Sequence, residues 1–142
     1  MVQFLVSFIF TVSLILSATL ADRERDSWKH AKLDPYTPEC ISIMTEETKN
    51  QYYKNFKTVD NDEIRAFYVC MLEHAGYMEA DRIIVNEIMK DFLKYYEPNF
   101  EGRQLGAQIL DKCNNKAKME VKRPNIAGRF VKCVMKEIES EI

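Results

Sequence analysis

The chain has 142 residues, of which 46% are hydrophobic and 30% charged, and its formal net charge at pH 7 is −2. This length suits one domain and leaves little room for a second. Acidic and basic residues are mixed along the chain without a basic stripe, so nucleic acid is not expected as a partner.

The N-terminal segment has the composition of a secretory signal peptide. Residues 4–20 carry only apolar or small hydroxylated side chains, and Ala-Thr-Leu-Ala at 18–21 precedes the charged sequence DRERD. We predict a signal peptide over residues 1–21 and a single secreted domain over residues 22–142. A single-span anchor is the alternative, but the run is short for a bilayer crossing, which takes about 20 residues. After cleavage, no stable membrane insertion is expected.

The first part of the predicted domain is polar and contains two prolines. Pro35 and Pro38 are expected to interrupt any helix before Cys40. Thr45 is placed to cap the helix that follows. The apolar side of that helix is expected to consist of three aromatic residues, Tyr52, Tyr53 and Phe56.

The stretch from Asp60 to Gly76 predicts the central helix of the fold. Asp60 and Glu63 have the spacing of a capping box. Gly76 can supply the left-handed residue that ends the helix. Between them, five residues at i, i+3, i+4, i+7 and i+8 form one apolar face: Ile64, Phe67, Tyr68, Met71 and Leu72.

Three further helices are predicted towards the C-terminus. Asp81 is placed to cap the first, whose apolar face includes Ile84, Ile88 and Phe92. Pro124 interrupts the chain after the second, and Asn125 is placed to cap the last. The apolar residues of these last two helices are Leu105, Ile109 and Leu110, and then Phe130, Val131, Val134 and Met135. No segment alternates as a strand does, so we predict an all-α single domain of five to six helices.

The four cysteines, Cys40, Cys70, Cys113 and Cys133, are expected to be oxidised in a secreted protein. Three pairings are possible from the sequence. Bridges that close the 40–70 and 113–133 loops would each contribute about 3 to 4 kcal/mol on the loop-entropy account. No Cys-x-x-Cys occurs, which argues against a redox site and a zinc knuckle.

Catalytic motifs are missing from the sequence. His30 and His74 are the two histidines, and neither belongs to a His-Glu-x-x-His arrangement; Gly-x-Ser-x-Gly and phosphate-binding glycine loops do not occur. The acidic residues from Asp60 resemble the start of a calcium loop, but Arg65 and Met71 occupy its glycine and glutamate positions. We therefore expect neither an enzyme nor a bound metal or cofactor. His74 is interpreted as either an ordinary last-turn residue of the central helix or a pH sensor.

Successive cysteines are separated by 29, 42 and 19 residues and follow a predicted signal peptide. This spacing resembles that of the insect odorant-binding proteins of the pheromone-binding and general odorant-binding type. Most of that family has six cysteines. The second and fifth cysteine positions correspond to Ala66 and Pro124 here, and these two cysteines are normally bonded to each other. The chain therefore resembles the four-cysteine, minus-C branch of the family, which implies the disulfides Cys40–Cys70 and Cys113–Cys133.

The resemblance implies a carrier that binds small hydrophobic ligands in an apolar cavity enclosed by the helices. We predict reversible binding and transport of an odorant, pheromone or lipid-like molecule through aqueous fluid, with an olfactory receptor or another protein as a further partner. The alternative is a secreted venom, salivary or reproductive-tract factor that uses the same scaffold to bind a protein. The candidate ligand-binding residues, each equally a candidate for plain core packing, are Tyr68, Met71, Ile84, Ile88, Phe92, Tyr95, Leu105, Ile109, Phe130 and Val134.

Overall fold

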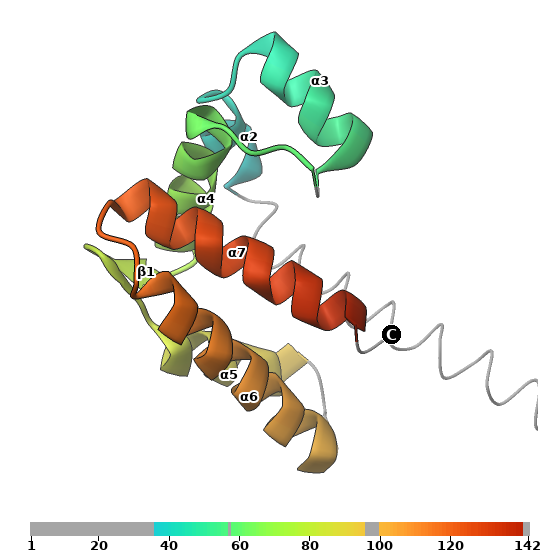
Figure 1. Ribbon diagram of the computed structural model, residues 1–142, viewed down its shortest axis with the longest axis vertical. Helices are drawn as coiled ribbons and strands as arrows, with labels where there is room; N and C mark the ends of the chain where they lie inside the picture. The colour runs from blue at the N-terminus through green and yellow to red at the C-terminus, as the bar shows by residue number, and fades with distance from the viewer. Residues whose placement is uncertain (1–35, 57, 96–99, 141–142) are drawn as a thin grey trace, which may run out of the picture.

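The computed structural model describes residues 36–56, 58–95 and 100–140, and within these ranges the side chains of residues 92–95, 100–103 and 138–140 are not described. The described part contains six helices and one short hairpin (Figure 1). The predicted signal peptide and Pro35 lie outside it. Helices predominate, so the predicted all-α fold is confirmed, and no helix of the described part is both long and apolar enough to cross a bilayer.

Two helices, α2 (Thr37–Ile41) and α3 (Glu46–Asn55), precede the central helix. Pro38 lies in the first turn of α2, where the missing N–H has no helical partner to lose, so it starts this helix of five residues. In α3, the predicted cap is confirmed, because the Thr45 side chain accepts from the Thr48 N–H. The predicted apolar side of α3 was partly wrong, since Tyr53 and Phe56 are exposed.

Helix α4 (Asp62–His74) runs through the middle of the fold, and its predicted apolar face is buried as a whole. The cap is Asn61, whose Oδ1 accepts from the Ile64 N–H at 2.9 Å, so the predicted capping by Asp60 was wrong. The end of α4 follows the prediction. Gly76 has a φ of +79°, and the Tyr77 N–H donates to the Leu72 carbonyl at 2.8 Å, which is the bond pattern of a Schellman motif.

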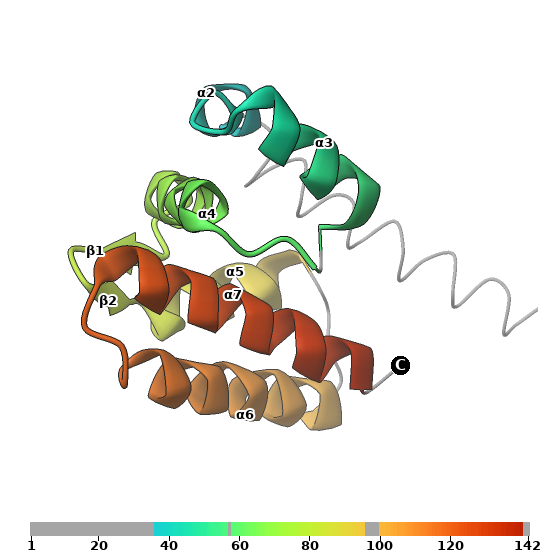
Figure 2. The same ribbon diagram turned by 45° about the horizontal axis from the view of Figure 1, so that its top comes forward.

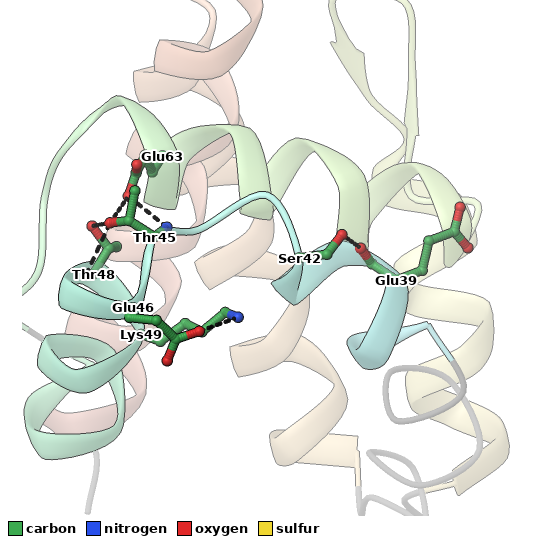
Figure 3. Close-up of polar contacts among 7 residues, drawn as sticks. All are labelled: Glu39, Ser42, Thr45, Glu46, Thr48, Lys49 and Glu63. Atoms are coloured by element: carbon green, nitrogen blue, oxygen red, sulfur yellow. Dashed lines mark hydrogen bonds and ion pairs between the residues drawn. The ribbon is translucent and has the colours of Figure 1, made fainter.

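Side-chain hydrogen bonds join the N-termini of α3 and α4. The Glu63 carboxylate accepts from the backbone N–H of Thr45 at 3.2 Å and from its hydroxyl at 3.0 Å (Figure 3). In the opposite direction, Asn61 Nδ2 donates to Thr48 Oγ1 at 3.2 Å. Hydrogen bonds from Thr48 and Thr45 hold the pKa of Glu63 below its usual value. These contacts fix where α3 sits against α4.

A short hairpin with two residues in each strand follows α4. Its strands β1 (Met78–Glu79) and β2 (Arg82–Ile83) are antiparallel, with Met78 opposite Ile83. No strand was predicted here, because each strand is too short to show alternation. Asp81 lies in the turn of this hairpin, next to Ala80 with a φ of +53°. The prediction that Asp81 caps a helix was therefore wrong, and α5 (Val85–Tyr95) begins later.

Helices α6 (Phe100–Ala117) and α7 (Arg123–Ser140) lie side by side and antiparallel, and α7 also packs against α4 (Figures 1 and 2). Pro124 lies in the first turn of α7. Asn125 lies within α7, so its predicted capping role was wrong, and its Oδ1 accepts from Arg65 Nη1 of α4 at 2.9 Å.

The two disulfides confirm the implied pairing. Cys40–Cys70 joins α2 to α4, and Cys113–Cys133 joins α6 to α7, with Cα–Cα distances of 5.6 and 5.4 Å. Both lie at the core, where Cys40 and Cys113 are fully buried. One covalent bond therefore ties α2 to α4, and the other ties α6 to α7.

Candidate ligand-binding site

The hydroxyl of Tyr68 is the most unusual polar group in the core. Tyr68 lies on the buried face of α4 and is 6% exposed, and its Oη has no hydrogen-bond partner among the described residues. Burial raises the pKa of Tyr68 to about 12, with smaller contributions from the nearby Tyr52 and Asp60. The phenol is therefore neutral at physiological pH and keeps its proton to donate. A buried donor without an acceptor costs about 1–3 kcal/mol, so this site would gain from an acceptor supplied by a ligand.

Aromatic rings from α3 and α4 surround one side of Tyr68. The Phe67 ring lies 5.9 Å from the Tyr68 ring and 5.4 Å from the Tyr52 ring, in an edge-to-face arrangement in the second pair. Burial, followed by the neighbouring Tyr53, raises the pKa of Tyr52. We refer to Tyr52, Phe67 and Tyr68 as the aromatic cluster. It offers apolar surface and two phenol hydroxyls, of which that of Tyr68 is buried without a partner among the described residues. Apolar surface with a few polar groups is the combination that small-molecule sites use for affinity and orientation.

The structure brings most of the candidate residues into one core. Tyr68, Met71 and Phe130 are buried together, and Ile88, Ile109 and Val134 are partly buried against them. Ile84 is half-buried just before α5 and borders a hollow that Glu79 and Asn114 also line, and Leu105 is half-buried on α6. The side chains of Phe92 and Tyr95 lie outside the described residues. Which of these residues contact a ligand stays a prediction.

Two residues of this core were missed by the sequence reasoning. The Tyr77 hydroxyl donates to Asp91 Oδ2 at 2.9 Å, and Tyr77 and Asp91 are 2% and 9% exposed. The bond joins the segment after α4 to the middle of α5. A signal for it was present, because Asp91 follows Ile88 by three residues and so falls on the apolar face of α5, where a carboxylate needs a buried partner.

His74 is the last residue of α4 and lies beside the Cys40–Cys70 disulfide. Its Nε2 is 3.6 Å from Glu39 Oε1, and its ring stacks on Tyr36 at a centroid distance of 5.0 Å. Potential ligand atoms of Cys40, Cys70 and His74 lie within 4.8 Å of one another. Both sulfurs are bonded in the disulfide and cannot act as thiolate ligands, so the group is not a metal site. A role of His74 in sensing pH stays a prediction.

Comparison with known proteins identifies the family of this scaffold. Residues 24–137 match the sequence profile of the PBP/GOBP family, the insect odorant-binding proteins. The chain belongs to the PBP/GOBP family. Its four cysteines are consistent with the minus-C branch of that family. Searches of curated proteins and of solved structures gave no significant match.

Membership of the PBP/GOBP family agrees with the chemistry of the core. Proteins of this family bind and carry small hydrophobic ligands and are not enzymes. The buried core that contains Tyr68 offers aromatic and aliphatic surface and, at Tyr68, a hydroxyl without a partner among the described residues, which suits reversible binding of an apolar ligand. The general role of this chain as a small-ligand carrier follows from the family.

Proposed function

We propose that this protein is a secreted carrier that binds odorants, pheromones or lipid-like molecules reversibly in an internal pocket bordered by the aromatic cluster. The buried Tyr68 hydroxyl carries this proposal, because a donor that finds no acceptor among the described residues is a costly feature in an apolar core. A ligand with a carbonyl or ester oxygen would accept that hydrogen bond while its hydrocarbon part fills the apolar surroundings. The preferred ligand therefore carries one acceptor on an apolar chain.

Further features support export and the binding of an apolar ligand. The signal-peptide composition of residues 1–21 supports export, and the two disulfides suit an oxidising fluid. The candidate residues that share the buried core with Tyr68, such as Met71 and Phe130, supply the apolar surface.

The test compares two ligands that differ in one acceptor. The oxidised protein over residues 22–142 is titrated with the apolar fluorescent probe phenylnaphthylamine, which is then displaced by an alkane and by the methyl ketone of the same chain length. We expect the ketone to bind more tightly, and we expect Tyr68→Phe to remove that difference. The expected loss of ketone affinity is about five- to tenfold, which corresponds to one hydrogen bond.

Tyr53→Phe is the matched control, because Tyr53 is 70% exposed on α3 and lies outside the buried core. This variant should bind both ligands as the unmodified protein does. Equal affinity of the two ligands for the unmodified protein would remove Tyr68 from the binding site, and failure of the probe to bind at all would overturn the carrier function.

One observation favours the second candidate, a secreted factor that binds another protein. Met119 and Val121 lie in the connection between α6 and α7 and are 76% and 90% exposed. Exposed apolar side chains of this kind mark contact sites for partners when they cluster. If the fluorescent probe does not bind, replacing Met119 and Val121 with Ser would test whether this loop contacts a partner.

A further inference from the structure

A charged hollow lies on the surface of α7, between the start of α4 and the last turn of α6. Its volume is about 390 Å³, within the range of small-ligand sites. We refer to it as the basic groove. Its lining comes from the segment before α4, from α4, α6 and α7 and from the α6–α7 connection, and consists of Asp60, Arg65, Lys116, Glu120, Asn125, Gly128, Arg129, Lys132, Cys133 and Lys136.

The basic groove has the opposite sign of charge from the whole chain. Five of its side chains are cationic and two, Asp60 and Glu120, are anionic, which gives the groove a formal charge of +3 against −2 for the chain. Arg129, Lys132 and Lys136 follow one another at i+3 and i+4 on the same face of α7. Like charges at this spacing destabilise a helix slightly. Arg129 is balanced by Glu120 at 3.3 Å and Lys132 by Asp60 at 3.1 Å, so Lys136 is the cation on this face that an added anion would neutralise.

Arg65 is fixed in the basic groove by three neighbours. Its Nε donates to Asp60 at 2.9 Å, and its Nη1 donates to Asn125 at 2.9 Å. A Cβ at Gly128 would lie 3.0 Å from Arg65 Cγ, so the glycine lets the stem of the arginine rest directly on α7. A guanidinium has five N–H donors, and these two bonds leave further donors for a ligand in a fixed orientation.

The lysines of the basic groove differ in how they are paired. Lys132 Nζ lies 3.1 Å from Asp60 Oδ2, and the other carboxylate oxygen of Asp60, Oδ1, accepts from Arg65. Lys116 and Lys136 are exposed, and within the described ranges neither makes an ion pair. One acid therefore holds two cations in place. Glu137, which is paired with Lys112, lies near Lys116 and Lys136 and balances part of their charge without forming an ion pair with either in the described ranges, so these two lysines are the ones that a bound anion would contact.

We propose that the basic groove binds a multivalent anion of the phosphate type, at a site separate from the apolar core. The formal charge of +3 exceeds what a single carboxylate could balance, whereas a phosphate or pyrophosphate group carries more charge. Arginine binds phosphate oxygens through two parallel N–H bonds, and lysine binds them as a point charge. A free phosphate ester and a phospholipid headgroup share this chemistry.

The test measures binding of pyrophosphate to the oxidised protein by isothermal titration calorimetry at low and at physiological ionic strength. The double variant Lys116→Gln/Lys136→Gln removes the two unpaired lysines and leaves the Asp60 contacts intact. We expect saturable binding that weakens about tenfold in this variant, on the scale of two exposed ion pairs. The control Lys90→Gln/Lys118→Gln removes two exposed lysines outside the basic groove and should bind pyrophosphate normally.

Two further measurements give this test its decisive outcomes. Flotation with phosphatidylcholine vesicles, with and without phosphatidic acid, shows whether the phosphate belongs to a lipid or to a soluble molecule. Binding to phosphatidic acid vesicles that is lost in Lys116→Gln/Lys136→Gln, the groove variant, assigns a lipid headgroup. Pyrophosphate binding without vesicle binding assigns a soluble phosphate. The proposal is overturned if pyrophosphate does not bind the unmodified protein, or if both double variants weaken binding equally. Phenylnaphthylamine binding should be unchanged in the groove variant, which separates this outcome from failure of the carrier function.

Discussion

The contact between Gly128 and Arg65 makes a prediction about the packing of α7 on α4. In Gly128→Ala, the new Cβ would lie 3.0 Å from Arg65 Cγ, closer than an ordinary contact, so the arginine stem has to shift by a few tenths of an ångström. Alanine in a helix interior is favoured over glycine by about 1 kcal/mol. The shift opposes this gain, because it lengthens the bonds from Arg65 to Asp60 and Asn125, which are both 2.9 Å.

The size of this effect follows from those two bonds. Hydrogen bonds to charged groups contribute about 1.5–3 kcal/mol when shielded, and much less on a side chain that is about one-third exposed, as Arg65 is. Partial loss of both bonds therefore costs about 1 kcal/mol or more. We expect Gly128→Ala to leave the free energy of unfolding unchanged or lower, and to raise it by about 1 kcal/mol when Arg65 is already replaced by Ala.

The assay is a double-mutant cycle of four oxidised proteins, each unfolded in urea and followed by circular dichroism. The coupling energy is the difference between the effects of Gly128→Ala in the two backgrounds, and independent sites agree within about 0.5 kcal/mol. An equal increase in stability in both backgrounds would refute the reasoning, because it would show that Arg65 moves aside at no cost.

Two further predictions concern the residues before α4. Asn61→Ala removes the cap of α4 and the bond to Thr48, and should lower the free energy of unfolding by about 1–2 kcal/mol. The control Asn50→Ala, at an exposed site on α3, should have little effect on the free energy of unfolding. Equal losses in the two variants would contradict this role of the cap. The hydrogen bond from Arg65, followed by that from Lys132, lowers the pKa of Asp60 below its value of 3.8 in the unfolded chain. The stability that the ionised carboxyl contributes is therefore present above pH 3.8 and is lost as the pH falls through the lower folded-state pKa. The difference in unfolding free energy between the unmodified protein and Asp60→Asn should shrink over that range in urea titrations at successive pH values, and a constant difference down to pH 2 would contradict the assignment.

The central helix could be predicted in detail from the sequence because its signals are local. The apolar face from Ile64 to Leu72 follows from spacing alone, and Gly76 ends the helix as expected because few other residues adopt its left-handed conformation. The family-type cysteine spacing also gave the correct disulfides. These features depend on residues within a few turns of one another or on a pattern that the whole family shares.

The helix caps were harder to predict because tertiary contacts compete for the same side chains. Asp60 and Asn125 are both good capping residues by type, yet both bond to Arg65, and Asn125 is 60 positions away from it in the sequence. Neighbouring residues, Asn61 for α4 and Lys122 before α7, take the boundary positions instead. Asp81 was drawn into a hairpin turn whose strands are too short to show a pattern.

The candidate site was only partly accessible to sequence reasoning. Spacing placed Tyr68, Met71 and Phe130 on apolar faces, and the structure buries them together. Spacing could not show that the Tyr68 hydroxyl has no partner among the described residues, since that depends on what the neighbouring helices bring to it. The same limit explains Tyr53, which belongs to an aromatic run on α3 but points away from the core while Tyr52 meets Phe67.

The positions of the two disulfides give the covalent chain an uneven topology. The disulfides close residues 40–70 and 113–133 into two covalent rings. The segment from Met71 to Lys112 connects the two rings through the backbone alone, because neither disulfide spans it. A protease that cuts this segment once would leave two ring-containing fragments with no covalent bond between them. Packing of α4 on α7 would then hold the pair together as a two-chain complex, so that reassembly of the fragments would measure the strength of that helix contact directly.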